Sequence, residues 1–388
     1  MRSRIPGILF LFILLSVGIA AWFSLPHRTG APSKLALTPV ALTGLPEWSS
    51  FDKRAAFAAF RRSCSAILKL QTDTELGGYA GRAGDWFGVC RTALAAGENA
   101  ARNFFESHFA AFEVGSEGLV TGYYEPLLQG SRTRHGTYQT PVYATPRDLV
   151  SVDLGAFRPE WKGERIAGAI SAQHLVPYAT RAELDEFPPP ASVLFYGDDP
   201  VAVFFLHIQG SGRVALDDGA TIRVAYAAQN GRPYSAIGTR LIHMGVLRRE
   251  TLSMQTIRAW LKANPSAARQ VMATNQSYVF FKEDPVGDAS LGSAGTEGVA
   301  LTPGASIAID PKFHALGVPI FVATQMPDGQ TLANLFIAQD TGGAIRGPAR
   351  ADVFFGFGPK AEALAGTMKA AGHLYVLLPN QLAQGVAR

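Results

Sequence analysis

The sequence reads Ile337-Ala338-Gln339-Asp340-Thr341-Gly342-Gly343-Ala344-Ile345-Arg346-Gly347, and soon afterwards Arg350-Ala351-Asp352-Val353-Phe354-Phe355-Gly356. The apolar run before Asp340 is typical of a strand, and Asp340 ends it at a turn rich in glycine, where positive φ angles cost little. Asp352 precedes three bulky apolar residues, so its carboxyl group should be poorly solvated and its pKa should rise. A carboxylic acid that stays protonated near neutral pH can protonate a leaving group. Asp352 is therefore a candidate general acid.

The other aspartates of this region have structural alternatives. Asp340 can accept hydrogen bonds from backbone amides of its own turn, and Asp310, which precedes a proline, is typical of a turn. An ion pair between Asp352 and Arg350 is not expected, because residues two apart on a strand share a face but extend in parallel. Without that partner, a charged Asp352 would be costly to bury.

The composition favours a β-rich protein with a substantial core. The chain has 388 residues, enough for two domains, of which 47% are hydrophobic and only 17% charged. The 40 glycines and 24 prolines indicate many turns between short strands. The net charge of +4 comes from scattered basic residues, which favours mild attraction to an anionic polymer and not nucleic-acid binding.

The N-terminus is typical of an export signal. Arg2 and Arg4 precede the uncharged stretch 5–25, which contains the small residues Gly18 and Ala20 for a signal peptidase and is also long enough to span a bilayer. A cleaved signal peptide and a retained membrane anchor both remain open, and the basic flank disfavours a buried core helix. Either way we expect an exported, periplasmic protein. No cysteine precedes Cys64, so no lipid-attachment cysteine follows the signal.

Cys64 and Cys90 are the only cysteines. Apolar residues at helical spacing predict helices over 52–70 and 87–112, whose facing stripes would bring the two cysteines together. In an oxidising compartment we expect a disulfide, the alternative being two buried thiols. Neither these cysteines nor the eight histidines show metal-ligand spacing, so we expect no metal and no cofactor.

The pattern of the rest of the chain predicts strands, interrupted by one helical region. Residues 26–46 are expected to be a linker, and from Leu119 the hydrophobic period changes to two. Strands are predicted at 119–125, 140–144, 193–196, 202–209, 221–225, 278–281, 306–310, 319–324, 335–340, 351–355 and 373–378. Helices are predicted at 235–244, 252–263, 266–273 and 360–370. Because strands and helices do not alternate regularly, we expect mainly β-barrel-type domains with appended helices.

The segment Gln209-Gly210-Ser211-Gly212 superficially resembles a dinucleotide fingerprint. That fingerprint needs a helix to begin at the glycines, whereas a hairpin-like segment follows here, so nucleotide binding is not expected. The glycines form either a tight turn or a wall of a polymer-binding groove, with Gln209 and Ser211 as hydrogen-bonding groups.

Two aromatic segments could contact sugar rings. In Tyr123-Tyr124-Glu125, alternate strand residues face opposite sides, so one tyrosine should be buried and the other exposed for stacking. The structural alternative is a core tyrosine pair with a surface glutamate. Tyr226 and Asn230, at a strand-to-helix transition, have the same two interpretations.

From Leu119 onward the chain resembles the MltA family of membrane-bound lytic murein transglycosylases. The resemblance rests on ordered blocks: Thr121-Gly122-Tyr123-Tyr124-Glu125-Pro126, Gln209-Gly210-Ser211-Gly212, Tyr226-Ala227-Ala228-Gln229-Asn230-Gly231, Ser235-Ala236-Ile237-Gly238, Ser253-Met254-Gln255, Asn275-Gln276-Ser277-Tyr278-Val279-Phe280-Phe281 and the block of Asp340 and Asp352. It departs from the family in lacking the lipoprotein cysteine and in having Gln276 where proline is frequent. The family also leaves Cys64 and Cys90 unexplained.

The resemblance implies a discontinuous double-psi β-barrel domain, 47–129 and 279–388, with a smaller β-domain inserted at 130–278. A groove between them would hold glycan strands of peptidoglycan. It implies cleavage of the β-1,4 bond between N-acetylmuramic acid and N-acetylglucosamine, with a 1,6-anhydro product and Asp352 as the catalytic residue. The expected substrate-binding residues are Tyr123, Tyr124, Gln209, Ser211, Gly212, Tyr226, Asn230, Asp340, Gly342 and Gly343.

Two rival functions remain at this stage. A hydrolase could pair Asp352 with Asp340 or Glu125, since ordinary glycosidases use two carboxyl groups. A non-catalytic, expansin-like module could bind the cell wall without cleaving it. In both cases the partner is peptidoglycan, and membrane contact would come only from the N-terminal segment.

Overall fold

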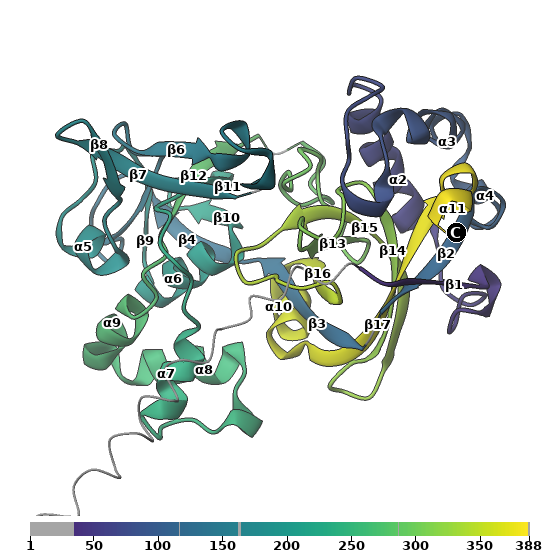
Figure 1. Cartoon of the computed structure of the whole chain (residues 1–388). Coiled ribbons are helices and arrows are strands. Elements are labelled where there is room, and N and C mark those ends of the chain that lie inside the picture. The colour runs from purple at the N-terminus through teal and green to yellow at the C-terminus, as the bar shows by residue number, and fades with distance from the viewer. Residues whose placement is uncertain (1–34, 116, 162–163, 286, 387–388) are drawn as a thin grey trace, which may run out of the picture. The chain divides into compact units, whose positions relative to one another are not determined.

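Six strands close into a barrel in the computed structural model, which describes residues 35–115, 117–161, 164–285 and 287–386 (Figure 1). The ring runs β17-β14-β15-β13-β16-β3, and β3 pairs back onto β17. These strands are β3 (Gly118–Glu125), β13 (Ser306–Ile309), β14 (Pro319–Gln325), β15 (Thr331–Thr341), β16 (Arg350–Phe357) and β17 (Lys369–Pro379). The closed, mixed barrel built from distant parts of the chain confirms the expected fold class.

The barrel wall contains both parallel and antiparallel pairs. β13 pairs with β15, and β16 with β3, in parallel, whereas the remaining four contacts around the ring are antiparallel. β13 is buried at all four residues, as expected for a short apolar strand covered on both faces. It lies between the two strands that carry Asp340 and Asp352.

Two further strands extend the wall beyond β17. β2 (Phe109–Val114) pairs with β17, and β1 (Leu37–Val40) pairs with β2. The prediction of a linker over 26–46 is therefore wrong for β1, whose backbone hydrogen bonds go to β2. The proposed export segment 1–25 lies outside the described residues. Within the described ranges, no helix has both the length and the apolar character needed to cross a membrane.

Three helices pack beside the barrel: α2 (Arg54–Ile67), α3 (Ala83–Ala95) and α4 (Ala101–His108). The single helix predicted over 87–112 is wrong, because Ala96 and Gly97 are extended and the chain turns into β2 at Phe109. Phe60 explains the misreading, since its ring lies 5.9 Å from Phe105 and 5.6 Å from Phe109, so helix and strand supply one aromatic cluster.

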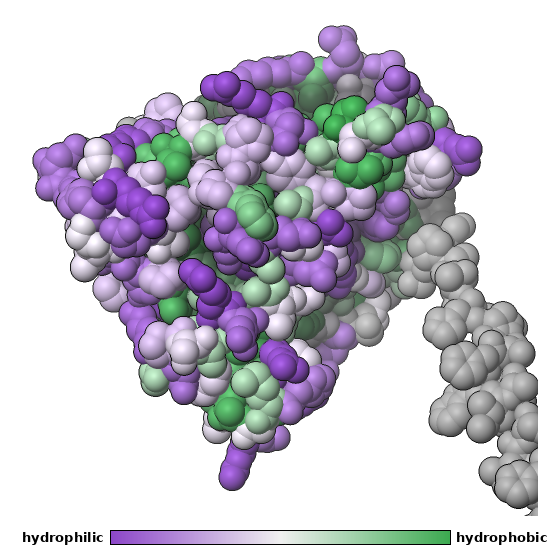
Figure 2. All heavy atoms as spheres, turned by 90° about the vertical axis from the view of Figure 1, so that its left-hand side faces the viewer, coloured by the Kyte–Doolittle hydropathy of each residue, from purple (hydrophilic) through white to green (hydrophobic). Residues whose placement is uncertain are grey.

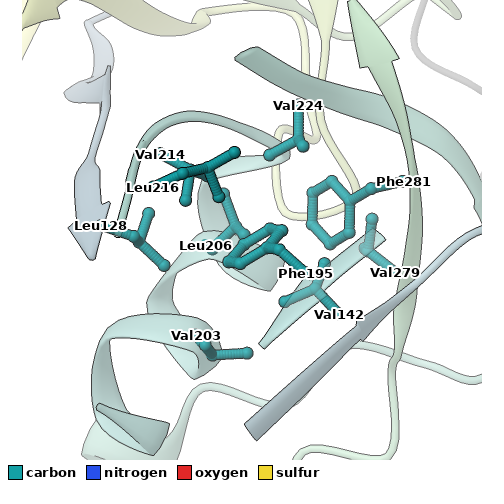
Figure 3. Close-up of a cluster of buried hydrophobic side chains, with 10 residues drawn as sticks. All are labelled: Leu128, Val142, Phe195, Val203, Leu206, Val214, Leu216, Val224, Val279 and Phe281. Carbon is teal, nitrogen blue, oxygen red and sulfur yellow. The ribbon is translucent and has the colours of Figure 1, made fainter. Parts of the chain in front are cut away.

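The second β-structure is a six-stranded sheet in the order β12-β11-β10-β4-β9-β5. Its strands are β4 (Leu127–Ser131), β5 (Thr140–Tyr143), β9 (Val193–Gly197), β10 (Ser211–Leu216), β11 (Thr221–Gln229) and β12 (Val279–Asp284). Ten buried apolar side chains fill its core (Figure 3). We call the part of the chain from β4 to β12, residues 127–284, the insert. Its first and last strands, β4 and β12, reach slightly beyond the expected limits of 130 and 278.

The predicted strand 202–209 is instead a helix, α6 (Pro200–Gln209). Asp199 caps its N-terminus by accepting a hydrogen bond from the amide of Val201, Pro200 occupies the first turn, and Gly210 ends it with φ +80°. Val203 and Leu206 enter the sheet core of Figure 3, whereas Phe204 and Phe205 pack on the helical side of the insert. A helix buried all round shows no amphipathic period, so the hydrophobic pattern was misleading.

The remaining elements cover the two sheets. Small strands β6 (Val150–Asp153), β7 (Arg165–Ser171) and β8 (His174–Pro177) form a third sheet. The helices are α5 (Arg181–Glu186), α7 (Ile237–His243), α8 (Met254–Ala263), α9 (Pro265–Ala273), α10 (Gly358–Thr367) and α11 (Asn380–Val386). On the face in Figure 2, hydrophobic residues lie in separate small groups among hydrophilic ones, which is ordinary for a protein surface.

A disulfide joins Cys64 of α2 to Cys90 of α3, with the Cα atoms 4.9 Å apart. Both cysteines are fully buried, and the expected pairing is confirmed. The bond fixes α2, the helix that contacts the end of β15 through hydrogen bonds from the Gln339 amide to the carbonyl of Ala59 and the hydroxyl of Ser63.

Reduction of this disulfide should destabilise the protein. The bond closes a loop of 26 residues, for which the loss of unfolded-chain entropy corresponds to about 3 kcal/mol. Denaturant unfolding with and without reductant measures the change, and the double variant Cys64→Ser/Cys90→Ser should be as weak as the reduced protein and insensitive to reductant. Equal stability of the oxidised and fully reduced proteins would contradict the expectation.

Candidate active site

The two sequence-predicted aspartates lie in one row across the barrel wall. Ala308 of β13 is the register partner of Asp340 on one side and of Asp352 on the other, and Asp352 is in turn the partner of Thr121 on β3. Cross-strand partners share a face, so the two carboxyl groups project from the same side, with Cα atoms two strand spacings, roughly 10 Å, apart. A bulge in the pairing of β13 with β15 brings Asp340 into this row, because Ile307 pairs with Ala338 and Ala308 with Asp340.

Asp352 is half-buried and has one direct side-chain hydrogen-bond donor among its described contacts, the hydroxyl of Thr121. The guanidinium of Arg350 donates to the same Thr121 oxygen at 2.8 Å, so it reaches Asp352 through the threonine. Desolvation is the largest influence and raises the pKa of Asp352, against the lowering effects of Thr121 and Arg350; the negative charge of Asp340 raises it further. The carboxyl group therefore favours the protonated form more than a surface aspartate does.

Apolar side chains explain the poor solvation of this row. Buried residues from β3, β13, β16 and the flanking loops pack together beside the carboxyl groups: Tyr123, Leu301, Ala308, Ile345 and Phe354. The rings of Tyr123 and Phe354 lie 5.2 Å apart. Tyr123 and Phe354 each follow a residue of the row by two positions, so they share its face. The aromatic run after Asp352 thus acts as the sequence predicted, by excluding water.

Asp340 is held by several donors. Its Oδ1 accepts hydrogen bonds from the amides of Thr296 and Thr341 and from the Thr296 hydroxyl, at 2.9–3.0 Å, and its Oδ2 accepts one from the Tyr123 hydroxyl at 2.9 Å. Desolvation nevertheless outweighs these bonds and raises the pKa of Asp340. The structural alternative is confirmed in part, because Asp340 accepts from the amide of its own turn and also fixes a second loop.

Tyr123 and Tyr124 are both buried, at 8% and 1% exposure. The expectation that one of them is exposed is therefore wrong. The Tyr123 hydroxyl is directed at Asp340, whereas Tyr124 packs against Ala361 and Ala365 of α10 and accepts a hydrogen bond from Arg258 of α8. Tyr123 belongs to the site, and Tyr124 joins the barrel to the helices of the insert.

In the glycine segment at the end of α6, Gln209 and Gly210 are half-buried, and Ser211 and Gly212 are buried. The side-chain oxygen of Gln209 accepts a hydrogen bond from the amide of Tyr124, and the Ser211 hydroxyl donates to Glu125. A Cβ atom on Gly212 would lie 2.6 Å from Leu206, so glycine is needed there for packing within the protein. The β10–β11 hairpin follows as expected, and the tight-turn interpretation fits better than a groove wall.

Glu125 is fully buried. The alternative interpretation of this segment, a core tyrosine pair with a surface glutamate, is therefore wrong for the glutamate. Its Oε1 accepts a hydrogen bond from the Ser293 amide at 2.6 Å, and its Oε2 accepts one from Arg213 at 3.3 Å. Arg223 forms a second ion pair at 3.9 Å. Glu125 thus joins the barrel strand β3 to the insert, and both of its carboxylate oxygens are engaged by these partners.

Of the other predicted binding residues, one is buried and bonded within the protein, and the others are at least partly exposed to solvent. Asn230 is fully buried, donating to the carbonyls of Ala179 and Gln276 and accepting from the amide of Tyr278. Tyr226 is 47% exposed at a bulge of β11. Gly342 is half-buried and Gly343 exposed, in the loop after Asp340.

Asp310 has the turn role expected of it. Its Oδ1 accepts from the amide of Lys312, and its Oδ2 accepts from the amide of Gly347 at 2.8 Å. Asp310 therefore also fixes the loop that connects Asp340 to Asp352.

Tyr234 is a site residue that the sequence patterns did not single out. It lies between β11 and α7 of the insert and is 40% exposed. Desolvation is the larger cause of the raised pKa of Tyr234, and the negative charge of Asp352 raises this pKa further. The only feature of the sequence that could have marked Tyr234 as a site residue is its position in the loop after Tyr226 and Asn230. Tyr234 is thus an accessible aromatic residue of the insert whose pKa responds to the charge of Asp352.

Metal binding finds no support in the described ranges, where no group of three histidine, cysteine or acidic side chains is arranged to hold an ion.

Comparisons with known proteins agree with this geometry. The family model of the MltA specific insert domain matches residues 119–282, and that of the 3D domain matches residues 305–378. The membrane-bound lytic murein transglycosylase A of Escherichia coli (strain K12) is 31% identical over 265 residues, 66% of this chain and 64% of that protein. The chain thus matches somewhat under two thirds of the length of this curated relative.

Solved structures match over more of the chain. A membrane-bound lytic murein transglycosylase from Agrobacterium tumefaciens is 31% identical with a TM-score of 0.81, covering 90% of this chain and 99% of the other. E. coli MltA with bound chitohexaose is 25% identical with a TM-score of 0.63, covering 90% and 96%.

A closed double-psi barrel that carries an aspartate row, with a second β-sheet inserted between β3 and β13, defines the class of MltA-type proteins with a 3D domain. This chain belongs to the family of membrane-bound lytic murein transglycosylases A.

The raised pKa of Asp352 should appear in the pH dependence of stability. A carboxyl group whose folded pKa exceeds its unfolded value stabilises most at low pH, and this stability is lost as pH rises through the folded pKa. Asp352→Asn should therefore match wild type near pH 4 and exceed it at neutral pH by about 1.4 kcal/mol for each unit of pKa elevation. Thermal unfolding from acid to neutral pH measures this, with the exposed Asp328→Asn as the control for lost charge. A neutral-pH wild type as stable as Asp352→Asn would contradict the assignment.

Proposed function

We propose that this protein is a lytic transglycosylase that cleaves the β-1,4 bond between N-acetylmuramic acid and N-acetylglucosamine in peptidoglycan and leaves a 1,6-anhydro end. The observation that supports this proposal most strongly is the environment of Asp352, which is half-buried beside apolar side chains, has a raised pKa and accepts one direct hydrogen bond from a hydroxyl group. Its environment favours a neutral acid that retains access to solvent and thus to a substrate.

One carboxyl group is sufficient for this reaction. Protonated Asp352 donates its proton to the glycosidic oxygen as the bond to C1 breaks, so the N-acetylglucosamine side leaves as an alcohol. The C6 hydroxyl of the muramic acid residue then forms a bond to C1, and its proton passes to the Asp352 carboxylate. The acid is regenerated and no water is consumed. Thr121 and Arg350 would stabilise the intermediate carboxylate, because both lower the pKa of Asp352.

The same geometry disfavours the two-carboxylate hydrolase. Asp340 accepts hydrogen bonds from Thr296, Thr341 and Tyr123, which leaves it little capacity to activate a water molecule. Glu125 is fully buried between its partners. Asp340 is better suited to raising the pKa of Asp352 and to ordering the loops around it.

The substrate would lie between the barrel row and the insert. The E. coli relative binds chitohexaose, a β-1,4-linked amino-sugar chain, and the glycan of peptidoglycan has the same linkage. Tyr234, close to the charge of Asp352, and the exposed Tyr226 supply rings for stacking against sugars. Gly342 and Gly343 would leave room beside Asp340. We propose the domain limits 47–129 and 279–388 for the barrel and 130–278 for the insert, widened for the insert by the residues with which β4 and β12 join its sheet, and an exported, periplasmic location.

Asp352→Asn should abolish cleavage of purified sacculi, because an amide can neither donate this proton nor accept it back. Mass spectrometry of the products identifies the reaction: anhydro ends lack one water relative to the reducing ends that a hydrolase would release. Reducing ends would refute the transglycosylase. Binding to sacculi without soluble products from the wild type would favour an expansin-like module, and a folded, active Asp352→Asn would refute the catalytic role.

Tyr234→Ala should weaken cleavage while Tyr234→Phe retains most of it, since stacking needs the ring and not the hydroxyl. The loss of one aromatic contact corresponds to about 1 kcal/mol, roughly a fivefold fall in rate at low substrate. Initial rates on sacculi measure the effect. Phe187→Ala, another exposed aromatic of the insert, is the matched control. If Tyr234→Ala and this control behave alike, Tyr234 does not contact the glycan.

A further inference from the structure

A further carboxyl group, half-buried, lies next to the strand that carries Asp340 and has no part in the proposed chemistry. Glu297 belongs to the loop between β12 and β13, and its Oε2 accepts a hydrogen bond from the Ser63 hydroxyl of α2 at 2.6 Å. Its backbone amide donates to the carbonyl of Gln339, the residue before Asp340, at 3.1 Å. Glu297 thus joins this loop to α2 and to the end of β15.

Glu297 and Thr296 attach to β15 side by side. Thr296 holds Asp340 through its amide and hydroxyl, and its hydroxyl also bonds to that of Thr341 at 2.8 Å. Gln339 is tied to the same helix, since its side-chain amide donates to the Ala59 carbonyl and the Ser63 hydroxyl. Any shift of Glu297 relative to α2 therefore acts on Thr296 and Gln339, the two residues whose contacts place Asp340.

The packing around Glu297 leaves little freedom for such a shift. A Cβ atom on Gly317, in the β13–β14 connection, would lie 2.8 Å from the Glu297 carboxyl, and one on Gly295 would lie 2.5 Å from the Gln339 carbonyl. The groups that face the carboxyl are Ser63 from α2, Gln339 from β15 and Gly317. None of these three is charged, so an ionised Glu297 lacks a cation among them.

We propose that Glu297 is a positioning residue for the acidic pair: it acts through Thr296 and holds Asp340, and with it the surroundings of Asp352, in place only while the carboxyl is neutral. This inference rests on the proposed function. Burial raises the pKa of Glu297 to about 7, so the group changes charge near neutral pH. Above that pH a poorly solvated anion faces polar but uncharged partners, and the loop should loosen.

Glu297→Gln tests the proposal, because glutamine keeps the shape and the acceptor for Ser63 but cannot ionise. At about pH 6 the variant and wild type should cleave sacculi at similar rates. At about pH 8 wild type should be slower than Glu297→Gln by up to about tenfold, since a group of pKa about 7 is then roughly nine-tenths ionised. Glu297→Ala should lose activity at both pH values, and Glu250→Gln, an exposed glutamate of the insert, is the control.

A readout without activity separates this inference from the proposed function. Hydrogen–deuterium exchange of the peptide over 293–301 should be faster in wild type than in Glu297→Gln at about pH 8, and equal at about pH 6. Superimposable pH profiles and exchange rates would overturn the positioning role, even if the products carry anhydro ends. If exchange differs as expected and no anhydro product forms, the coupling stands and the proposed reaction fails.

Discussion

The pairing of β3 with β16 is the constraint on which the site depends. It sets Thr121 beside Asp352 in register, although 231 residues separate them in the chain, and it closes the barrel because β3 pairs on its other side with β17. The hydroxyl of Thr121 then meets the carboxyl, and Tyr123, two residues later, meets Asp340. Without this strand pairing, Asp352 would lose its Thr121 donor, Asp340 would lose its Tyr123 donor, and both would lose part of their apolar shielding.

The desolvation of the row comes from elements of different kinds. Phe354 belongs to the same strand as Asp352, Tyr123 to its neighbour, and Leu301 and Ile345 to loops. The loops are themselves fixed by polar contacts, Asp340 to Thr296 and Asp310 to Gly347. An apolar environment that raises a carboxyl pKa therefore depends on a polar network that orders the loops carrying it.

Much of this arrangement could be predicted from the sequence, and the failures have physical causes. The barrel strands show period-two patterns, and the poor solvation of Asp352 follows from its own neighbours. The helix α6 was missed because it is buried on all sides, and Tyr123 and Tyr124 were misjudged because helix α10 and the acidic row cover opposite faces of β3. The roles of Thr121, Thr296 and Tyr234 depend on contacts between distant segments, which no local pattern encodes.

The closure of the barrel by β17 has a consequence for biogenesis. β3 emerges early during synthesis, yet its partners β16 and β17 are the last strands of the chain. The intervening insert has its own core and can collapse first, while β3 keeps an unpaired edge until β16 and β17 have been synthesised. A topology of such high contact order folds slowly, so the barrel should close well after the insert has formed its own core.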